Sequence, residues 1–478
     1  MEKYRKIVDG KDSKTKWKNE RRNIFMVLCY EALLFGIELT IFEPSEYFYF
    51  KRFSNTQAAV LCYSLSLACS VLTALISSFT VSYLIRRHEL YSGTSLMLML
   101  VSILGYVIYC TARAPYLVIL GKSLAGFGKS TNIVSSVYLQ RLYSNEELEL
   151  KMIVLTNFVT IGSILGPFFT YIFVLIDTNL HVLYLSYENA PGFYLAIFKL
   201  ILFILAFFLL NDIPGENDQE HFIHSKKRFT QLFCHSSETH DKDESACQGL
   251  FAQCTFTESE DSERELNETL EPTRSRNVVS ITTAAQEMLN IDTSLILLVV
   301  ISYGMVFKII NTLIPVESSL YLEWGAKRVA AISIVNCLVG TIASMFLTWC
   351  IEKTSHYIAM FAGMLACVVS LSLFSSLPSF NQQETPFTGI FCSMSILNVL
   401  MSCFIGLSSR LVLMHCVEKK FRQFSDAFRA CLLEISYLIG ALLTAGVHMN
   451  LTISGTTLAV FNFVLFVAVI VKLKKLWI

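Results

Sequence analysis

The chain has 478 residues, of which 54% are hydrophobic and only 16% are charged. This balance lies outside the range that is typical of soluble globular domains. The 38 Lys and Arg residues equal the 38 Asp and Glu residues, so the net charge gives no indication of a nucleic-acid partner.

Apolar stretches of about 20 residues follow one another along the chain. Each is long enough to cross, as an α-helix, a hydrocarbon core about 30 Å thick. We therefore predict an all-α integral membrane protein with twelve transmembrane helices. The expected spans are residues 24–43, 57–84, 91–111, 116–137, 152–177, 192–211, 294–314, 327–350, 357–376, 387–411, 428–448 and 456–472.

A long polar segment separates the first six spans from the last six. Residues 212–293 hold many charged, Ser and Thr side chains and are too polar to bury a core, so we expect them to be disordered. The expected organisation is a basic tail over 1–23, a six-helix bundle over 24–211, a cytosolic loop over 212–293, a second six-helix bundle over 294–472 and a short tail over 473–478.

The basic residues of the short flanks favour a cytosolic location for both termini. Two pairs, Lys51–Arg52 and Lys327–Arg328, are exceptions on the opposite side. A cytosolic N-terminal tail would expose Tyr4-Arg-Lys-Ile7, which has the pattern of a sorting signal for adaptor proteins. The sequon Asn450-Leu-Thr452 would lie on the far side, where Asn450 is a candidate glycosylation site.

Several motifs in the first half resemble the major facilitator superfamily. They are Gly105-Tyr-Val-Ile-Tyr109, Leu120-Gly-Lys-Ser-Leu-Ala-Gly126-Phe-Gly128, Asn132 and Ile161-Gly-Ser-Ile-Leu-Gly166-Pro167. More narrowly, the first half is similar to the lysosomal branch that contains the neuronal ceroid lipofuscinosis type seven protein (major facilitator superfamily domain-containing protein eight). The segment Ser78 to Arg87 keeps only the final basic pair of the family's loop motif, and Val137 stands where the family has Arg.

The resemblance implies a bundle of two pseudo-symmetric six-helix halves that moves small solutes or anions by alternating access. It also implies a lysosomal or other endomembrane location, with the plasma membrane as the alternative. Spans one, four, seven and ten of such a fold line a central cavity.

Ionisable side chains within spans indicate function, because each costs roughly 2.5–3.5 kcal/mol at the centre of the bilayer. Those on the four cavity-lining spans, together with one amide, are our candidates for a substrate or ion cavity: Glu31, Glu38, Lys129, Lys308, Asn311 and Arg410. We expect Glu38 to form a charge pair with Lys129 or Lys308 in the cavity; the alternative is that these charges satisfy each other and hold helices together. Glu31 and Arg410 could instead extend to the cytosolic interface.

Small residues on the fourth, fifth and eleventh spans are typical of close helix packing. They are Gly126, Gly128, Gly162, Gly166 and Gly440, with Pro167 as the expected kink.

We predict alternating-access transport of a small, anionic solute, coupled to protons through Glu38 or Glu31. The alternatives are a channel-like anion pathway in an endomembrane and a non-transporting scaffold or receptor. No sequence motif indicates an enzyme, a cofactor or a metal site. The expected partners are a small-molecule or ion substrate, the lipid bilayer and sorting adaptors at Tyr4–Ile7, with no nucleic acid.

Overall fold

A computed structural model describes residues 2–88, 91–143, 145–176, 186–210, 290–351, 356–380, 384–417 and 422–473. The secondary structure of these residues is helical. Most of the predicted loop over 212–293 lies outside them. The side chains of the first 16 residues, and with them Tyr4–Ile7, also lie outside the described part.

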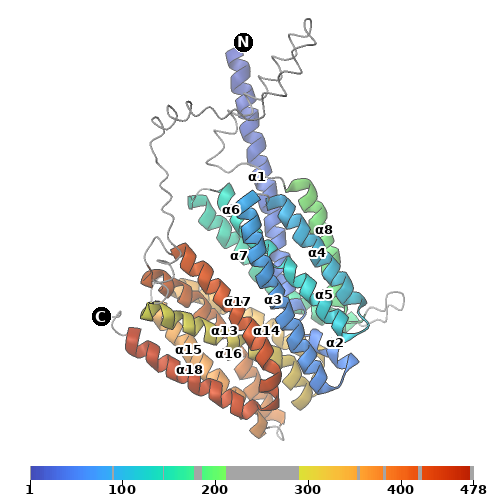
Figure 1. Cartoon of the computed structure of the whole chain (residues 1–478), viewed down its shortest axis with the longest axis vertical. Helices are drawn as coiled ribbons and strands as arrows, with labels where there is room; N and C mark the ends of the chain where they lie inside the picture. The colour runs from blue at the N-terminus through green and yellow to red at the C-terminus, as the bar shows by residue number, and fades with distance from the viewer. Residues whose placement is uncertain are drawn as a thin grey trace, which may run out of the picture. The chain divides into compact units, whose positions relative to one another are not determined.

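The first bundle contains the helices before the long loop (Figure 1). They are α1 (Glu2–Ile41), α2 (Glu46–Phe53), α3 (Thr56–His88), α4 (Tyr91–Thr111), α5 (Pro115–Gly128), α6 (Thr131–Leu142), α7 (Asn145–Ile176) and α8 (Ala190–Leu209). The short helix α2 was not predicted, and its buried face carries Glu46, Tyr47, Tyr49 and Phe50.

The second bundle contains the helices after the loop. They are α13 (Ile291–Tyr321), α14 (Ala326–Ile351), α15 (His356–Ser376), a 3-10 turn (Leu377–Phe380), α16 (Glu384–Cys416), α17 (Arg422–Met449) and α18 (Leu451–Leu473).

Within the described residues, eleven helices are long and apolar enough to cross a membrane. The twelfth expected span, the fourth, is divided into α5 and α6 at Lys129 and Ser130. Here the Lys129 N–H donates to the Gly126 carbonyl at 3.1 Å, an i to i−3 bond of the 3-10 type. Two glycines end α5, and their low helix propensity favours an interruption at this point.

The two bundles repeat one order of neighbours. Helix α1 packs against α7, and α13 packs correspondingly against α17. Helix α4 packs against α5 and α8, and α15 packs in the same way against α16 and α18. In both bundles the first span therefore packs against the fifth, and the third span packs against the fourth and the sixth. This shared pattern is expected of two related six-helix halves.

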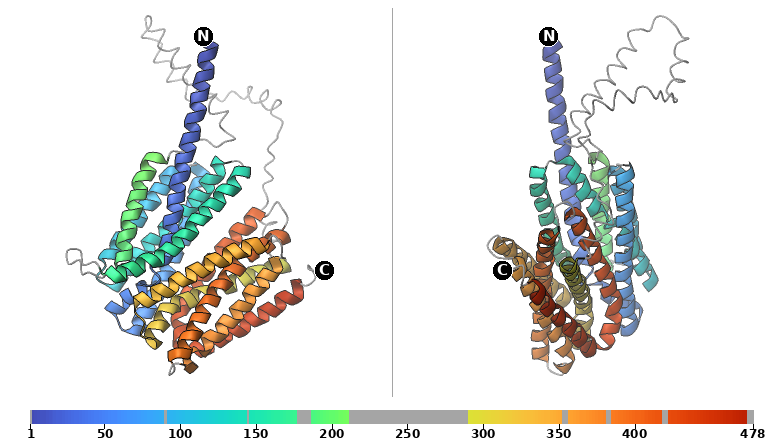
Figure 2. Two further views of the ribbon diagram at one scale, coloured as in Figure 1. Left: turned by 180° about the vertical axis from the view of Figure 1, so that it is seen from behind. Right: turned by 60° about the vertical axis from the view of Figure 1, so that its left-hand side comes forward.

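The bundles contact each other through α7 against α14 and α3 against α17. Near α2 the ammonium group of Lys51 donates to the Ser319 hydroxyl at 2.9 Å. At the same end the Lys327 ammonium group lies 5.9 Å from the Tyr171 ring centroid. Figure 2 shows the helices of the two bundles converging toward this end and diverging toward the end at which α1 enters.

The backbones of α1 and α7 approach each other at glycines. A Cβ atom on Gly162 would collide with the Leu33 carbonyl, and one on Gly36 would collide with the Val159 carbonyl. Gly166 lies in the same way against Thr40. Any larger side chain here would force the two helices apart.

The remaining predicted packing residues also lie at helix contacts. Gly126 faces Ser70 on α3, Gly128 faces Ser102 on α4, and Gly440 faces Met305 on α13. Pro167 lies inside α7.

Candidate functional site

Glu38 does not pair with Lys129 or Lys308, so that expectation was wrong. A carboxylate oxygen of Glu38 lies 3.3 Å from the ammonium nitrogen of Lys199 on α8, and neither side chain is exposed. An apolar interior makes an unpaired charge very costly, so these two groups neutralise each other within the first bundle. The sequence marks Lys199 as a charge within an otherwise apolar span, but it does not indicate that Glu38 is its partner.

Glu31 also lies in the interior of the first bundle rather than at the cytosolic interface. Its side chain is only 1% exposed, and it accepts a hydrogen bond of 2.5 Å from the Ser135 hydroxyl on α6. The alternative that Glu31 extends to the interface is therefore wrong.

Lys129 occupies the interruption between α5 and α6. Its ammonium group donates to the Ser70 hydroxyl on α3 at 3.1 Å, and the side chain is half-buried. A single serine hydroxyl leaves the ammonium group with two further hydrogens, so Lys129 can still donate to another group.

Lys308 on α13 contributes a second half-buried cation, from the other bundle. It acts electrostatically on Glu43, which follows the end of α1. Burial raises the pKa of the Glu43 carboxyl to about 6, although Lys308 and Lys122 both favour its charged form. Among the acidic groups that act on Lys308, which also include Glu46 and Glu434, Glu43 has the largest effect.

The carboxylate of Glu434 on α17 interacts electrostatically with both lysines. Lys129 from the first bundle and Lys308 from the second are the cations that act on its carboxylate. The Glu434 side chain is exposed on α17. Glu43, Lys129, Lys308 and Glu434 together are called the central charge cluster below.

A buried ion pair lies next to the cluster. The Lys122 ammonium group on α5 is 3.2 Å from a Glu46 carboxylate oxygen on α2, and both side chains are almost fully buried. Glu46 also accepts a hydrogen bond of 2.6 Å from Ser66, and Lys122 lies 3.2 Å from the Phe42 ring centroid. This ion pair holds α2 against α5 of the first bundle.

The other two candidates differ in position. Asn311 is half-buried on α13 and accepts a hydrogen bond of 2.9 Å from the buried Asn398 amide on α16. It lies one helical turn from Lys308 and can add a polar contact beside it. Arg410 is exposed near the end of α16.

Sequence reasoning missed several charged groups for two reasons. Glu43 was the last residue of the first expected span and was not weighed as a charge within it, whereas Glu46 was assigned to a loop, because α2 is too short to give a clear periodic signal. Lys122 and Lys199 do lie within expected apolar spans, and their cost in a bilayer could have identified them. Glu317 lies beyond the expected seventh span, which ended at residue 314, and enters it only because α13 continues to Tyr321. Glu317 is 2.9 Å from the ring Nδ1 atom of His448, which joins α13 to α17.

The chain belongs to the major facilitator superfamily, a family of membrane transporters, because the model of that family matches residues 32–441. No curated protein matches the chain significantly in sequence.

Solved structures of transporters share the fold. The nucleoside transporter NupG aligns with a TM-score of 0.62 at 11% identity, covering 95% of this chain and 98% of that one. A D-xylose-proton symporter aligns with a TM-score of 0.61 at 11% identity, over 94% and 96% of the two chains. A POT family transporter in complex with a thioalcohol-conjugated peptide gives 0.62 at 13% identity, over 95% and 96%. Similarity at this identity establishes the fold alone.

Proposed function

We propose that this chain carries a small anionic solute across a membrane by alternating access, and that the solute binds between Lys129 and Lys308. One observation carries the proposal: a lysine from each bundle acts on the same exposed carboxylate, that of Glu434. An anionic group placed there would interact with both halves at once. A solute that contacts both halves can favour one arrangement of the bundles over another.

The two acidic members of the cluster would serve as counter-ions while the site is empty. Glu43 acts electrostatically on Lys308 from the first bundle, and Glu434 acts on both lysines from the second. An incoming carboxylate or phosphate would replace these interactions with charge-assisted hydrogen bonds, which are roughly twice as strong as neutral ones. Asn311 would add a polar contact on the side of Lys308.

Proton coupling follows from the position of Glu43. Its pKa of about 6 makes the carboxyl mostly protonated at about pH 5 and mostly charged at neutral pH. Protonation removes the negative charge that competes for Lys308, so an anion should bind more tightly in acid. The proton and the anion would then be carried together. Glu38 is less suited to this role because Lys199 already neutralises it in the core.

The described structure supports a state in which the α2 end is closed. The Lys51 hydrogen bond to Ser319 joins the bundles there. Alternating access would require this contact to break when the site opens at that end.

Counterflow into liposomes tests the proposal. Purified full-length protein, preloaded with unlabelled solute, should accumulate labelled small carboxylates or phosphate but not nucleosides or neutral sugars. Removal of charge in Lys129→Ala or Lys308→Ala should abolish the signal, whereas Lys472→Ala, which removes an exposed lysine at the end of α18, should not. Accumulation of neutral solutes by all variants would contradict the anion assignment, and single-channel currents would indicate a channel.

The cellular placement is also part of the proposal. We infer a lysosomal or related endomembrane location with cytosolic termini, as the resemblance to the lysosomal branch and the basic flanks suggest. Asn450 is exposed in the turn between α17 and α18, where a glycan could be attached. Tags at both termini should be stained in cells whose plasma membrane alone is permeabilised. Staining only after all membranes are opened would contradict this orientation.

A further inference from the structure

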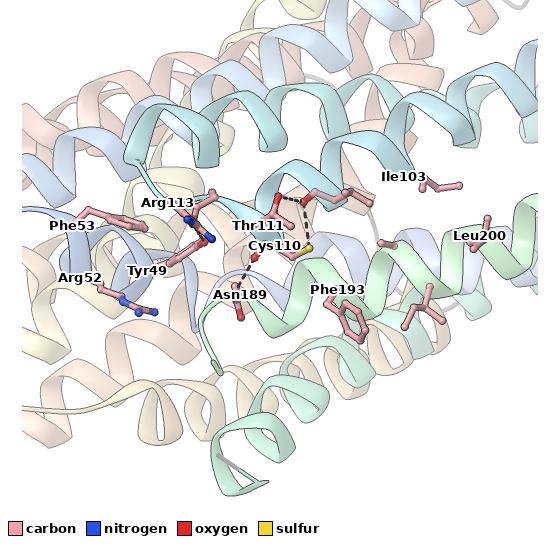
Figure 3. A pocket seen from close by; sticks show the side chains of 14 residues that line it. Tyr49, Arg52, Phe53, Ile103, Cys110, Thr111, Arg113, Asn189, Phe193 and Leu200 are labelled. Atoms are coloured by element: carbon pink, nitrogen blue, oxygen red, sulfur yellow. Dashed lines mark hydrogen bonds between the residues drawn. The ribbon is translucent and has the colours of Figure 1, made fainter. Parts of the chain in front are cut away.

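A pocket of about 840 Å³ lies on the outer side of the first bundle, away from the central charge cluster. It runs between α4 and α8 and ends at α2. Figure 3 shows Arg52, Arg113 and Tyr49 at one end of this pocket and Ile103 and Leu200 at the other. The pocket therefore has a cationic end and an apolar end.

The apolar end faces the surroundings of the bundle. Val107, Ile197 and Leu200 are each more than a third exposed, although they lie on helices that cross a membrane. In a bilayer such side chains contact lipid tails. A hydrocarbon chain along α4 and α8 would cover them.

The cationic end carries a net positive charge. Arg52 pairs with Glu188 at 3.3 Å, whereas Arg113 is exposed and makes no ion pair or hydrogen bond with any residue that the structure describes. Two arginines and one glutamate leave one positive charge. That charge matches the single negative charge of a phosphodiester whose head group carries no cation.

Neighbouring groups hold this end in shape without competing for an anion. The Tyr49 hydroxyl donates to the Ala112 carbonyl at 2.9 Å, and the Asn189 amide donates to the Cys110 carbonyl at 3.0 Å. Both carbonyls at the end of α4 are thus already satisfied. These hydrogen bonds also join α2 and the start of α8 to the end of α4. They therefore fix the backbone positions of the two arginines relative to each other.

We propose that this pocket binds an anionic phospholipid, with the phosphate at Arg113 and Arg52 and one acyl chain along the apolar groove. Arg52 belongs to one of the two basic pairs that depart from the charge bias of the loops, and Arg113 lies at the same end of the pocket. A lipid ligand accounts for both arginines. The planar guanidinium group of Arg can bind two phosphate oxygens at once, whereas the ammonium group of Lys acts as a point charge. Two arginines therefore suit a phosphate head group. The proposal is independent of what the central charge cluster transports.

Native mass spectrometry of the purified full-length protein tests it. The probes are phosphatidylglycerol and phosphatidylcholine with identical acyl chains. We expect the protein to retain about fivefold more phosphatidylglycerol than phosphatidylcholine. This ratio corresponds to about 1 kcal/mol, the attraction of one basic residue to an anionic lipid surface. Arg113→Gln should remove that preference, and Leu200→Trp should reduce retention of both lipids by filling the groove.

Arg328→Gln is the matched control. It removes an exposed arginine near the start of α14, at the same end of the protein, without touching the pocket. Equal retention of the two lipids by the unaltered protein would overturn the proposal. So would an equal loss in Arg113→Gln and Arg328→Gln, which would indicate general charge attraction. Displacement of the lipid by millimolar inorganic phosphate would overturn it as well, since the site would then recognise free phosphate.

Discussion

Glu38 and Lys199 lie 3.3 Å apart in the interior of the first bundle, where neither side chain is exposed. They join α1, the first helix of the bundle, to α8, its last. Within a low-dielectric interior each charge depends on the other, because an ion left alone there has no water to solvate it. We therefore expect this pair to stabilise the folded bundle rather than to contact a solute.

Glu38→Gln should therefore destabilise the protein more than it impairs any coupling. Removing one partner of a buried ion pair costs about 3–5 kcal/mol, because the other charge stays buried and uncompensated. The unfolding temperature of the detergent-solubilised protein should fall clearly. Replacing both residues, as in Glu38→Leu with Lys199→Met, should recover most of the loss. A single variant as stable as the unaltered protein would show that the pair is not formed.

Solute binding should depend on pH through Glu43. The pKa of this carboxyl is raised to about 6 by burial, so its charge is lost as the pH falls through that value. Anion affinity should rise toward about pH 5 and decline above pH 6. In Glu43→Gln, which mimics the protonated form, affinity should stay high and flat across the range. An unchanged pH profile in this variant would assign the titration to another group.

The contact of α1 with α7 should not tolerate a side chain at Gly162. A valine there would meet the Leu33 carbonyl, and overpacking of this kind typically costs about 1–3 kcal/mol. We expect Gly162→Val to unfold at a lower temperature and to be recovered in lower yield. Gly389→Val on α16 is the control, since a Cβ atom at Gly389 would meet no neighbouring atom. The substitution is again Gly to Val within a helix. Similar losses in both variants would contradict the close contact.

Lys51 should help to keep the α2 end closed. Lys51→Ala removes its 2.9 Å hydrogen bond to Ser319 and with it one link between the bundles. A hydrogen bond contributes about 1 kcal/mol, so the population open at that end should rise severalfold. Distances between spin labels placed near α2 and near the start of α14 can measure this shift. An unchanged distance distribution would exclude Lys51 as part of the closure.

The architecture could be predicted well from the sequence, because the bilayer imposes a strong length requirement on each apolar stretch. The fourth span was the exception. Its interruption at Lys129 depends on backbone hydrogen bonds at Gly126 and Phe127, and hydropathy does not detect them. The short helix α2 was missed for the related reason that eight residues give too little periodicity.

The candidate site was harder to predict, because charges within a bundle choose partners by three-dimensional proximity. Hydropathy correctly identified Glu38 as a costly charge but could not indicate that α8 would bring Lys199 against it. Lys129 and Lys308 do lie near the interface of the two bundles, with Glu434 as the carboxylate on which both act. Glu43 enters the cluster only because the chain turns back immediately after α1.

Binding of a small anion by the two lysine variants tests the central claim most directly. With the solute identified by counterflow, its dissociation constant should be measured by isothermal titration calorimetry at about pH 5.5. Loss of a hydrogen bond to a charged group weakens binding by roughly ten- to a hundredfold. Lys129→Ala and Lys308→Ala should each show such a loss, and Lys472→Ala should bind as the unaltered protein does. If both cluster variants kept full affinity, the solute would not bind between Lys129 and Lys308.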